Sequence, residues 1–297
     1  MTALPRSIPE YLDQLRAALA GADPALVQDA LYDAEEYLRS ELAENPGRDE
    51  ADVIASVASS YGAPHEVASI YRDTEVRVQS ALRAPKPAPR ETPLGRFFGV
   101  AADPHTYGAL FYSVLALATG IFYFTWVVTG VSLSAGLAVL IIGIPFAILF
   151  LGSVRVLSLV EGRIVEAMLG ERMPRRPLYA ERGKGVWARV KDMFSDPRTW
   201  STLFYQFLML PLGIVYFTLA VTALTLAFAI AVAPLAEAIT GYPALLWWDD
   251  IAWSLPLWTT PLTIAIGLAL LLATMHGARG IGYLHGQIAK QLLVKTA

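Results

Sequence analysis

The sequence predicts an all-α protein: a small cytosolic helical domain followed by a polytopic membrane domain whose four transmembrane helices form two parallel hairpin repeats. Three observations lead to this prediction. The 297 residues are 55% apolar and only 16% charged, which is too apolar for an ordinary soluble domain of this length. Charged residues gather near the front, and the rest contains four long apolar runs and an internal repeat. The expected boundaries are 1–82 for the helical domain, 83–93 for a linker and 94–297 for the membrane domain, with repeats 94–175 and 187–297.

Acidic side chains are concentrated in the first third of the chain. Residues 1–100 hold 16 of the 26 acidic and 10 of the 23 basic side chains, a net charge of −6. The remaining residues carry 10 acids and 13 bases, a net charge of +3. This division is typical of a cytosolic module joined to a membrane domain, and the acidic front argues against direct nucleic-acid binding. The absence of cysteine excludes disulfides, thiolate metal sites and a cysteine nucleophile.

Apolar residues at helical spacing predict about four helices in the first domain. Ser7 is suited to cap the first helix and Asp23 the second, which we expect to span about 24–44. A short helix around Val53 follows, and the Gly-Ala-Pro turn at 62–64 starts the last one.

Three segments of this domain carry a family pattern. They read EYLDQLRAAL at 10–19, YDAEEYLRSEL at 32–42 and YGAPHEVASIY at 61–71. In this order they resemble the HAAS signalling domain of bacterial membrane proteins, over roughly residues 8–76. The resemblance implies an association with PadR-type transcriptional regulators and the relay of a signal to them.

The linker 83–93 has four prolines in eleven residues. Such a composition favours a semi-rigid, extended tether.

The second part of the chain contains a duplication. Without gaps, residues 103–134 and 196–227 are identical at sixteen of thirty-two positions. The similarity returns downstream, where RVLSLVEGRI at 155–164 and RGIGYLHGQI at 279–288 share their Arg, Gly and final Ile. Each repeat is therefore expected to contain an interfacial segment, a helical hairpin and an amphipathic tail.

Four apolar runs are long enough to cross a hydrocarbon core of about 30 Å. The expected spans are about 109–128, 133–154, 202–233 and 257–275. Lysines and arginines gather in the linker, in the connection 155–198 and in the C-terminal tail, whereas the turn near Ser132 and the loop 234–257 have none. This distribution predicts that both termini are cytosolic and that the repeats are parallel.

The paired motifs GIFYFT at 120–125 and GIVYFT at 213–218, DPRTW at 196–200 and the tail VEGRIVEAMLG at 160–170 define a second resemblance. Over about residues 94–297 the chain resembles the sensor domain of bacterial histidine kinases and related membrane proteins. No kinase region follows in these residues, so we expect output to pass through the helical domain at the front.

Two Asp-Pro pairs, Asp103 with Pro104 and Asp196 with Pro197, stand before the first span of each repeat. Aspartate accepts hydrogen bonds from free backbone N–H groups at a helix start, and proline is tolerated in the first turn. We interpret these residues as structural caps rather than as a chemical site.

The second outer loop is the candidate sensing site, because it concentrates aromatic and acidic residues. Its candidate residues are Tyr242, Trp247, Trp248, Asp249, Asp250 and Trp253. An aromatic belt at the membrane interface explains the tryptophans by itself. The paired aspartates leave open a site for a cation or a cationic, amphipathic ligand, assisted by cation–π attraction.

The connection between the repeats is basic. Its candidate residues are Arg172, Arg175, Arg176, Arg182, Lys184, Arg189 and Lys191. These side chains are expected to contact anionic lipid headgroups. A second hypothesis is a charge-sensitive latch against the acidic first domain.

The remaining polar residues indicate no catalytic chemistry. The four histidines show no metal-ligand spacing, and we expect no metal and no cofactor. Tyr123 and Tyr216 correspond between the repeats, and we interpret them as packing residues. No catalytic triad, phosphate loop or membrane carboxylate pair is evident, so an enzyme is not expected.

Together these features predict a non-catalytic signal-transduction protein of the bacterial inner membrane, which relays an envelope or membrane cue to a cytosolic regulator. Alternatives are a transporter or channel for a hydrophobic or amphipathic substrate, and a structural subunit of a larger membrane complex. Homo-oligomerisation remains open.

Overall fold

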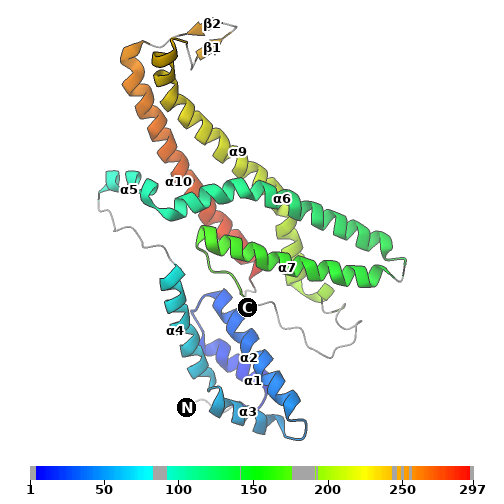
Figure 1. The fold of residues 1–297 in the computed structure, drawn as a ribbon. Helices are drawn as coiled ribbons and strands as arrows, with labels where there is room; N and C mark the ends of the chain where they lie inside the picture. The colour runs from blue at the N-terminus through cyan, green and yellow to red at the C-terminus, as the bar shows by residue number, and fades with distance from the viewer. Residues whose placement is uncertain are drawn as a thin grey trace.

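The computed structural model describes residues 5–82, 92–140, 142–175, 191, 193–242, 246–248, 251–253 and 256–294 (Figure 1). The Pro-rich segment 83–91 lies outside them. The elements are α1 (Ile8–Ala18), α2 (Pro24–Glu44), α3 (Glu50–Ser60), α4 (Pro64–Leu82), α5 (Pro93–Gly99), the 3-10 helix η1 (Val100–Ala102), α6 (Pro104–Leu137), α7 (Gly143–Leu169), α9 (Pro197–Thr240), β1 (Leu246–Trp248), β2 (Ile251–Trp253), the 3-10 helix η2 (Leu257–Thr259) and α10 (Thr260–Leu293).

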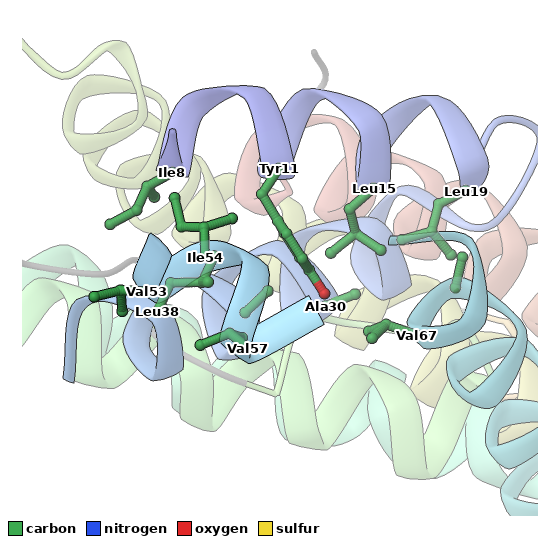
Figure 2. Packing of buried hydrophobic residues seen from close by; sticks show 12 residues of the cluster. Ile8, Tyr11, Leu15, Leu19, Ala30, Leu38, Val53, Ile54, Val57 and Val67 are labelled. Carbon is green, nitrogen blue, oxygen red and sulfur yellow. The ribbon is translucent and has the colours of Figure 1, made fainter. Parts of the chain in front are cut away.

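Helices α1–α4 form an N-terminal unit around one apolar core (Figure 2). Ser7 and Asp23 cap α1 and α2, as the sequence predicts. The hydroxyl of buried Tyr11 donates to the carbonyl oxygen of Gly62 at 2.7 Å and so connects α1 to the turn before α4. The hydroxyl of Tyr71 donates to Asp33 at 2.7 Å, and burial raises its pKa, so the donor remains protonated.

The helices α6, α7, α9 and α10 form the membrane domain. Each is long and apolar enough to span a bilayer, which agrees with the four predicted spans. The predicted turn near Ser132 is wrong, because α6 continues to Leu137. The stretch TGVSLSAG at 129–136 contains no proline, so no residue in it forces the helix to end. The chain reverses instead at Gly143, where a Cβ atom would lie 2.0 Å from the carbonyl oxygen of Leu137.

The two hairpins, α6 with α7 and α9 with α10, cross each other (Figure 1). At the crossing, glycine permits the backbones of α6 and α9 to touch. A Cβ atom on Gly120 would lie 2.5 Å from the carbonyl oxygen of Met209, and one on Gly213 would lie 2.3 Å from that of Ala116. Gly120 corresponds to Gly213 and Ala116 to Met209 in the repeat, so this contact follows the internal symmetry.

Two ion pairs join the repeats reciprocally. Arg155 on α7 contacts Asp196 at the start of α9 at 3.2 Å, and Arg279 on α10 contacts Asp103 at the start of α6 at 3.1 Å. Both aspartates also cap their own helices by accepting from the backbone N–H groups of Arg198 and His105. Each helix start is therefore connected to the tail of the other hairpin.

The connection between α9 and α10 contains a feature that the sequence did not predict. β1 and β2 form a short antiparallel hairpin in which Leu246 pairs with Trp253 and Trp248 with Ile251. α9 also continues to Thr240, so part of the expected loop 234–257 is helical. These are the only strands in the described ranges.

We expect Gly213→Ala to destabilise the membrane domain by about 1–3 kcal/mol, because the new Cβ atom forces α6 and α9 apart. The measurement is the apparent Tm of the full chain in detergent. Gly136→Ala is the matched control, since Gly136 lies on α6 with no atom within 4 Å of its Cβ position. Equal melting temperatures for both variants would contradict the tight crossing.

Candidate functional site

A cluster of buried polar side chains lies where the four long helices meet. Tyr112 and Tyr123 come from α6, Glu161 from α7, Tyr205 from α9 and His285 from α10. The exposed fraction of each is 2% or less. We call this set the central cluster. Within the described residues, no lysine or arginine forms a salt bridge with Glu161.

Hydrogen bonds connect all members of the central cluster. The hydroxyls of Tyr112 and Tyr205 donate to Oε1 of Glu161 at 2.7 and 3.0 Å. The hydroxyl of Tyr123 donates to Oε2 at 3.1 Å. Nε2 of His285 lies 2.5 Å from the Tyr112 hydroxyl and 2.9 Å from the Tyr205 hydroxyl. Two tyrosine hydroxyls therefore bridge the carboxylate and the imidazole.

Hydrogen-bond capacity determines the histidine tautomer. With the three tyrosine hydroxyls donating to Glu161, the proton of His285 is assigned to Nε2, where the Tyr112 and Tyr205 oxygens accept it. Nδ1 is then the unprotonated nitrogen of a neutral ring, and it has no hydrogen-bond partner among the described residues. Three hydroxyl donors around the Glu161 carboxyl group are the partners that a buried carboxyl group requires.

The central cluster follows the internal repeat. Tyr112 aligns with Tyr205, Tyr123 with Tyr216, and Glu161 with His285. Sequence reasoning missed it because Glu161 and His285 lie beyond the apolar runs, on amphipathic tails where an ionisable residue is ordinary. A signal was present: the aligned tails place an ionisable residue before glycine in both copies. Tyr123 and Tyr216, interpreted as packing residues, are indeed buried, and Tyr123 also donates to the carboxylate.

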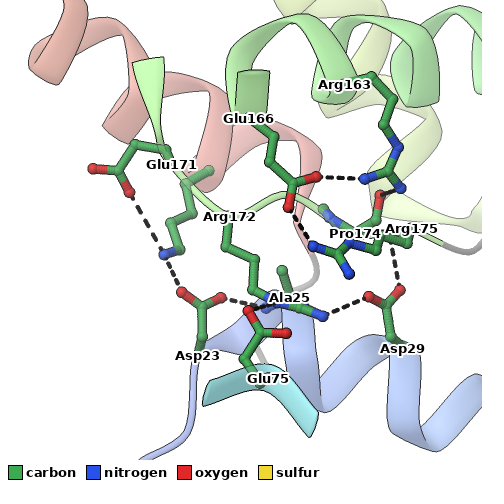
Figure 3. A network of polar contacts seen from close by, with 11 residues as sticks. Asp23, Ala25, Asp29, Glu75, Arg163, Glu166, Glu171, Arg172, Pro174 and Arg175 are labelled. Atoms are coloured by element: carbon green, nitrogen blue, oxygen red, sulfur yellow. Dashed lines mark hydrogen bonds and ion pairs between the residues drawn. The ribbon is translucent and has the colours of Figure 1, made fainter. Parts of the chain in front are cut away.

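A second polar site joins the membrane domain to the N-terminal unit (Figure 3). Arg172, three residues after α7, extends between α2 and α4. Its Nη2 lies 3.0 Å from Asp29 and its Nε lies 2.9 Å from Glu75. The backbone N–H of Arg175 donates to Asp29 at 2.8 Å. The side chains of Arg172, Asp29 and Glu75 are 7%, 6% and 11% exposed, so this ion pair is shielded from solvent.

The end of α10 contributes the rest of this junction. Nζ of Lys290 lies 2.5 Å from Asp23, the residue that caps α2. Ala25 on α2 is fully buried and belongs to the same apolar cluster as Met173 and Leu293. The N-terminal unit thus contacts the tails of both hairpins.

The central cluster and the junction share one packed core. That apolar cluster extends from Ala25 through Val165 and Ala289 to Tyr112 and Tyr205. A displacement of one long helix would disturb the hydrogen bonds of a buried charge, and the same core would transmit the change to α2. The arrangement is suited to couple helix positions to the N-terminal unit.

The residues expected in the sensing loop are only partly described. Tyr242 is 76% exposed at the end of α9. Trp247, Trp248 and Trp253 lie in β1 and β2, and their side chains are not described. Asp249 and Asp250 lie outside the described residues.

The structure separates the residues of the basic connection. Arg172 and Arg175 lie at the junction, whereas Lys191 is exposed. Arg176, Arg182, Lys184 and Arg189 lie outside the described residues. No group of three or more acidic or histidine side chains within reach of one metal ion occurs in the described part of the chain.

We predict that Tyr123→Phe lowers the free energy of unfolding by about 1–3 kcal/mol, because it removes a donor from a buried carboxylate. Tyr216→Phe is the matched control at the corresponding position: its ring packs edge-on against His285, and no hydrogen bond of its hydroxyl occurs within the described ranges. Denaturant titration of both variants in the same detergent is the measurement. Equal destabilisation would argue against an ionised Glu161.

Comparison with known families assigns both parts of the chain. Residues 10–69 match the HAAS family, which covers α1–α3 and the start of α4. Residues 112–293 match the family described as Putative sensor, and this region contains the central cluster, Arg172 and Lys290. Comparison with curated proteins and with solved structures gives no match. Both matched families are non-catalytic. The chain therefore belongs to the Putative sensor family and carries a HAAS domain in front of its four membrane-spanning helices.

Proposed function

We propose that this protein is a non-catalytic signal-transduction protein of the bacterial inner membrane, with both termini in the cytosol. It relays an envelope or membrane cue to a cytosolic regulator through its HAAS domain. HAAS domains associate with PadR-type regulators, so a regulator of this class is the proposed partner.

The observation that carries this proposal is the position of Arg172. The residue belongs to the sensor region, yet its guanidinium is buried between Asp29 and Glu75 of the N-terminal unit. Breaking such a pair leaves uncompensated buried charge, so the contact favours one of two discrete states. Movement of α7 would withdraw Arg172 and leave the carboxylates of Asp29 on α2 and Glu75 on α4 open to another partner.

The proposed mechanism is a shift between a docked and a released state. Rearrangement of the four helices changes the hydrogen bonds of Glu161, and the tails of α7 and α10 carry that change to the junction. Release exposes Asp29 and Glu75, together with the buried start of α2, to a regulator. The cue needs only to bind the two states with different affinity.

The topology can be tested with single cysteines, because the native chain contains none. We expect Tyr242→Cys to react with a membrane-impermeant maleimide in intact spheroplasts, and Ser59→Cys to react only after lysis. Both native side chains are exposed, so access depends on the side of the membrane. The opposite labelling pattern would overturn the proposed orientation.

The coupling can be tested by hydrogen exchange on the full chain in proteoliposomes. We expect Arg172→Gln to speed amide exchange in α2 and α4 by roughly tenfold or more, because it leaves two carboxylates without their partner. Arg16→Gln, which removes an exposed ion pair with Asp13, is the control and should leave exchange within about twofold.

Glu161→Gln supplies the decisive comparison, since it alters the membrane domain without touching the junction. If it changes the rate of amide exchange in α6, α7, α9 and α10 and also in α2, the relay is supported. If α2 and α4 are unaffected, the two parts are uncoupled and the proposed mechanism fails.

The partner is tested by affinity capture with tagged full-length protein in cells that co-express a PadR-type regulator. Specific capture that changes between wild type and Arg172→Gln supports the relay. Substrate flux by the reconstituted protein, without regulator binding, would favour a transporter.

A further inference from the structure

An apolar cavity opens between α6, α7 and the start of α9. Its volume is about 370 Å³, and it is lined almost entirely by apolar side chains. Ala135, Ala147, Leu151, Trp200 and Leu203 are among the residues that line it. Because these helices are long enough to span a bilayer, the environment that fills such a cavity is lipid.

A smaller polar cavity of about 50 Å³ lies next to it. Two guanidinium groups, those of Arg155 and Arg198, line this space together with one carboxylate, that of Asp196. The hydroxyl-bearing residues Ser158 and Thr202 add polar groups. Two cations against one anion leave a net positive charge, which suits a phosphate group.

Thr199 lines both cavities, and Arg155 follows Leu151 by one helical turn on the same side of α7. The apolar cavity and the arginine pair are therefore neighbouring parts of one amphipathic site. We propose that this site binds one anionic phospholipid, with its phosphate at Arg155 and Arg198 and an acyl chain in the apolar cavity.

The symmetry-related site, between α9, α10 and the start of α6, has an incomplete headgroup half. Its matching apolar cavity, of about 490 Å³, is lined by Tyr107 and Phe228, the counterparts of Trp200 and Ala135. Arg279 corresponds to Arg155, but His105 stands where the second repeat has Arg198. The site between α10 and the start of α6 thus offers one guanidinium where the site between α7 and the start of α9 offers two, so only the latter is selective for an anionic headgroup.

The site reaches the N-terminal unit. Gln28 on α2 lines the polar cavity beside Met173 and Pro174, next to Arg172. A bound headgroup would therefore affect docking of α2, and anionic lipid would regulate the relay. That consequence rests on the proposed function, whereas lipid binding itself does not.

The test is native mass spectrometry of the full chain in detergent, titrated with phosphatidylglycerol or phosphatidylcholine, with inorganic phosphate as a separate arm. We expect one phosphatidylglycerol to be retained in preference to phosphatidylcholine. Arg198→Gln should weaken its binding by about tenfold or more, because a charge-assisted hydrogen bond is lost. Arg279→Gln, the control in the symmetry-related site, should change it less than about threefold.

Ala135→Phe tests the acyl-chain half independently. It introduces the residue that the other repeat carries at Phe228, so the fold accommodates an aromatic side chain there, and it should also weaken phosphatidylglycerol binding by about tenfold. Arg198→Lys keeps the positive charge, so it should retain part of the affinity for phosphatidylglycerol. This second variant separates the loss of charge from poor folding of Arg198→Gln.

Three outcomes would overturn the proposal. They are equal retention of both lipids by the wild type, equal effects of Arg198→Gln and Arg279→Gln, and displacement by inorganic phosphate with no effect of Ala135→Phe. The last would indicate a free-anion site. Hydrogen exchange at the junction is a separate readout, so failure of lipid binding is distinguishable from failure of the relay.

Discussion

The close crossing of α6 and α9 at Gly120 and Gly213 is the constraint on which the membrane domain depends. Because these two positions have no side chain, the backbones of α6 and α9 come into direct contact. The space that a Cβ atom would need is taken by a carbonyl oxygen of the other helix. Tyr112 on α6 and Tyr205 on α9, which occupy equivalent positions in the two repeats, are then brought close together. Their hydroxyls meet the carboxylate of Glu161 and the imidazole of His285, which α7 and α10 bring to the same point. Close packing thus creates the site for a buried charge, and the charge in turn requires that packing.

A buried carboxylate with three donors responds to movement more sharply than an apolar core does. Losing a donor leaves a charge uncompensated at low dielectric, so the helices prefer discrete arrangements over a continuous range. The same apolar cluster extends to Ala25 and Met173, where Arg172 joins the N-terminal unit. Duplication supplied the symmetric frame, and the copies differ at the polar sites. Glu161 of the first repeat corresponds to His285 of the second, and His105 of the first corresponds to Arg198 of the second.

Sequence patterns predicted the helices well where local signals are strong. The caps at Ser7 and Asp23 and the four apolar spans correspond to observed elements, because a capping side chain and a 20-residue apolar run each act over short distances. The predicted turn near Ser132 was wrong because small residues permit a turn but do not require one. The helix continues instead to Leu137, whose carbonyl oxygen lies against Gly143 at the start of α7. The hairpin of β1 and β2 lacked a clear strand signal in its aromatic-rich segment.

The sequence by itself determined the class of the protein: an acidic helical module, a duplicated hairpin domain and two family patterns. It also contained the alignment of Glu161 with His285, although nothing local distinguishes a buried ionisable residue from an exposed one on an amphipathic tail. Only the tertiary structure decided that these two residues meet through tyrosine hydroxyls and that Arg172 inserts between Asp29 and Glu75. Such contacts join residues 44 to 173 positions apart, and their energy depends on distance and burial, which periodicity does not encode.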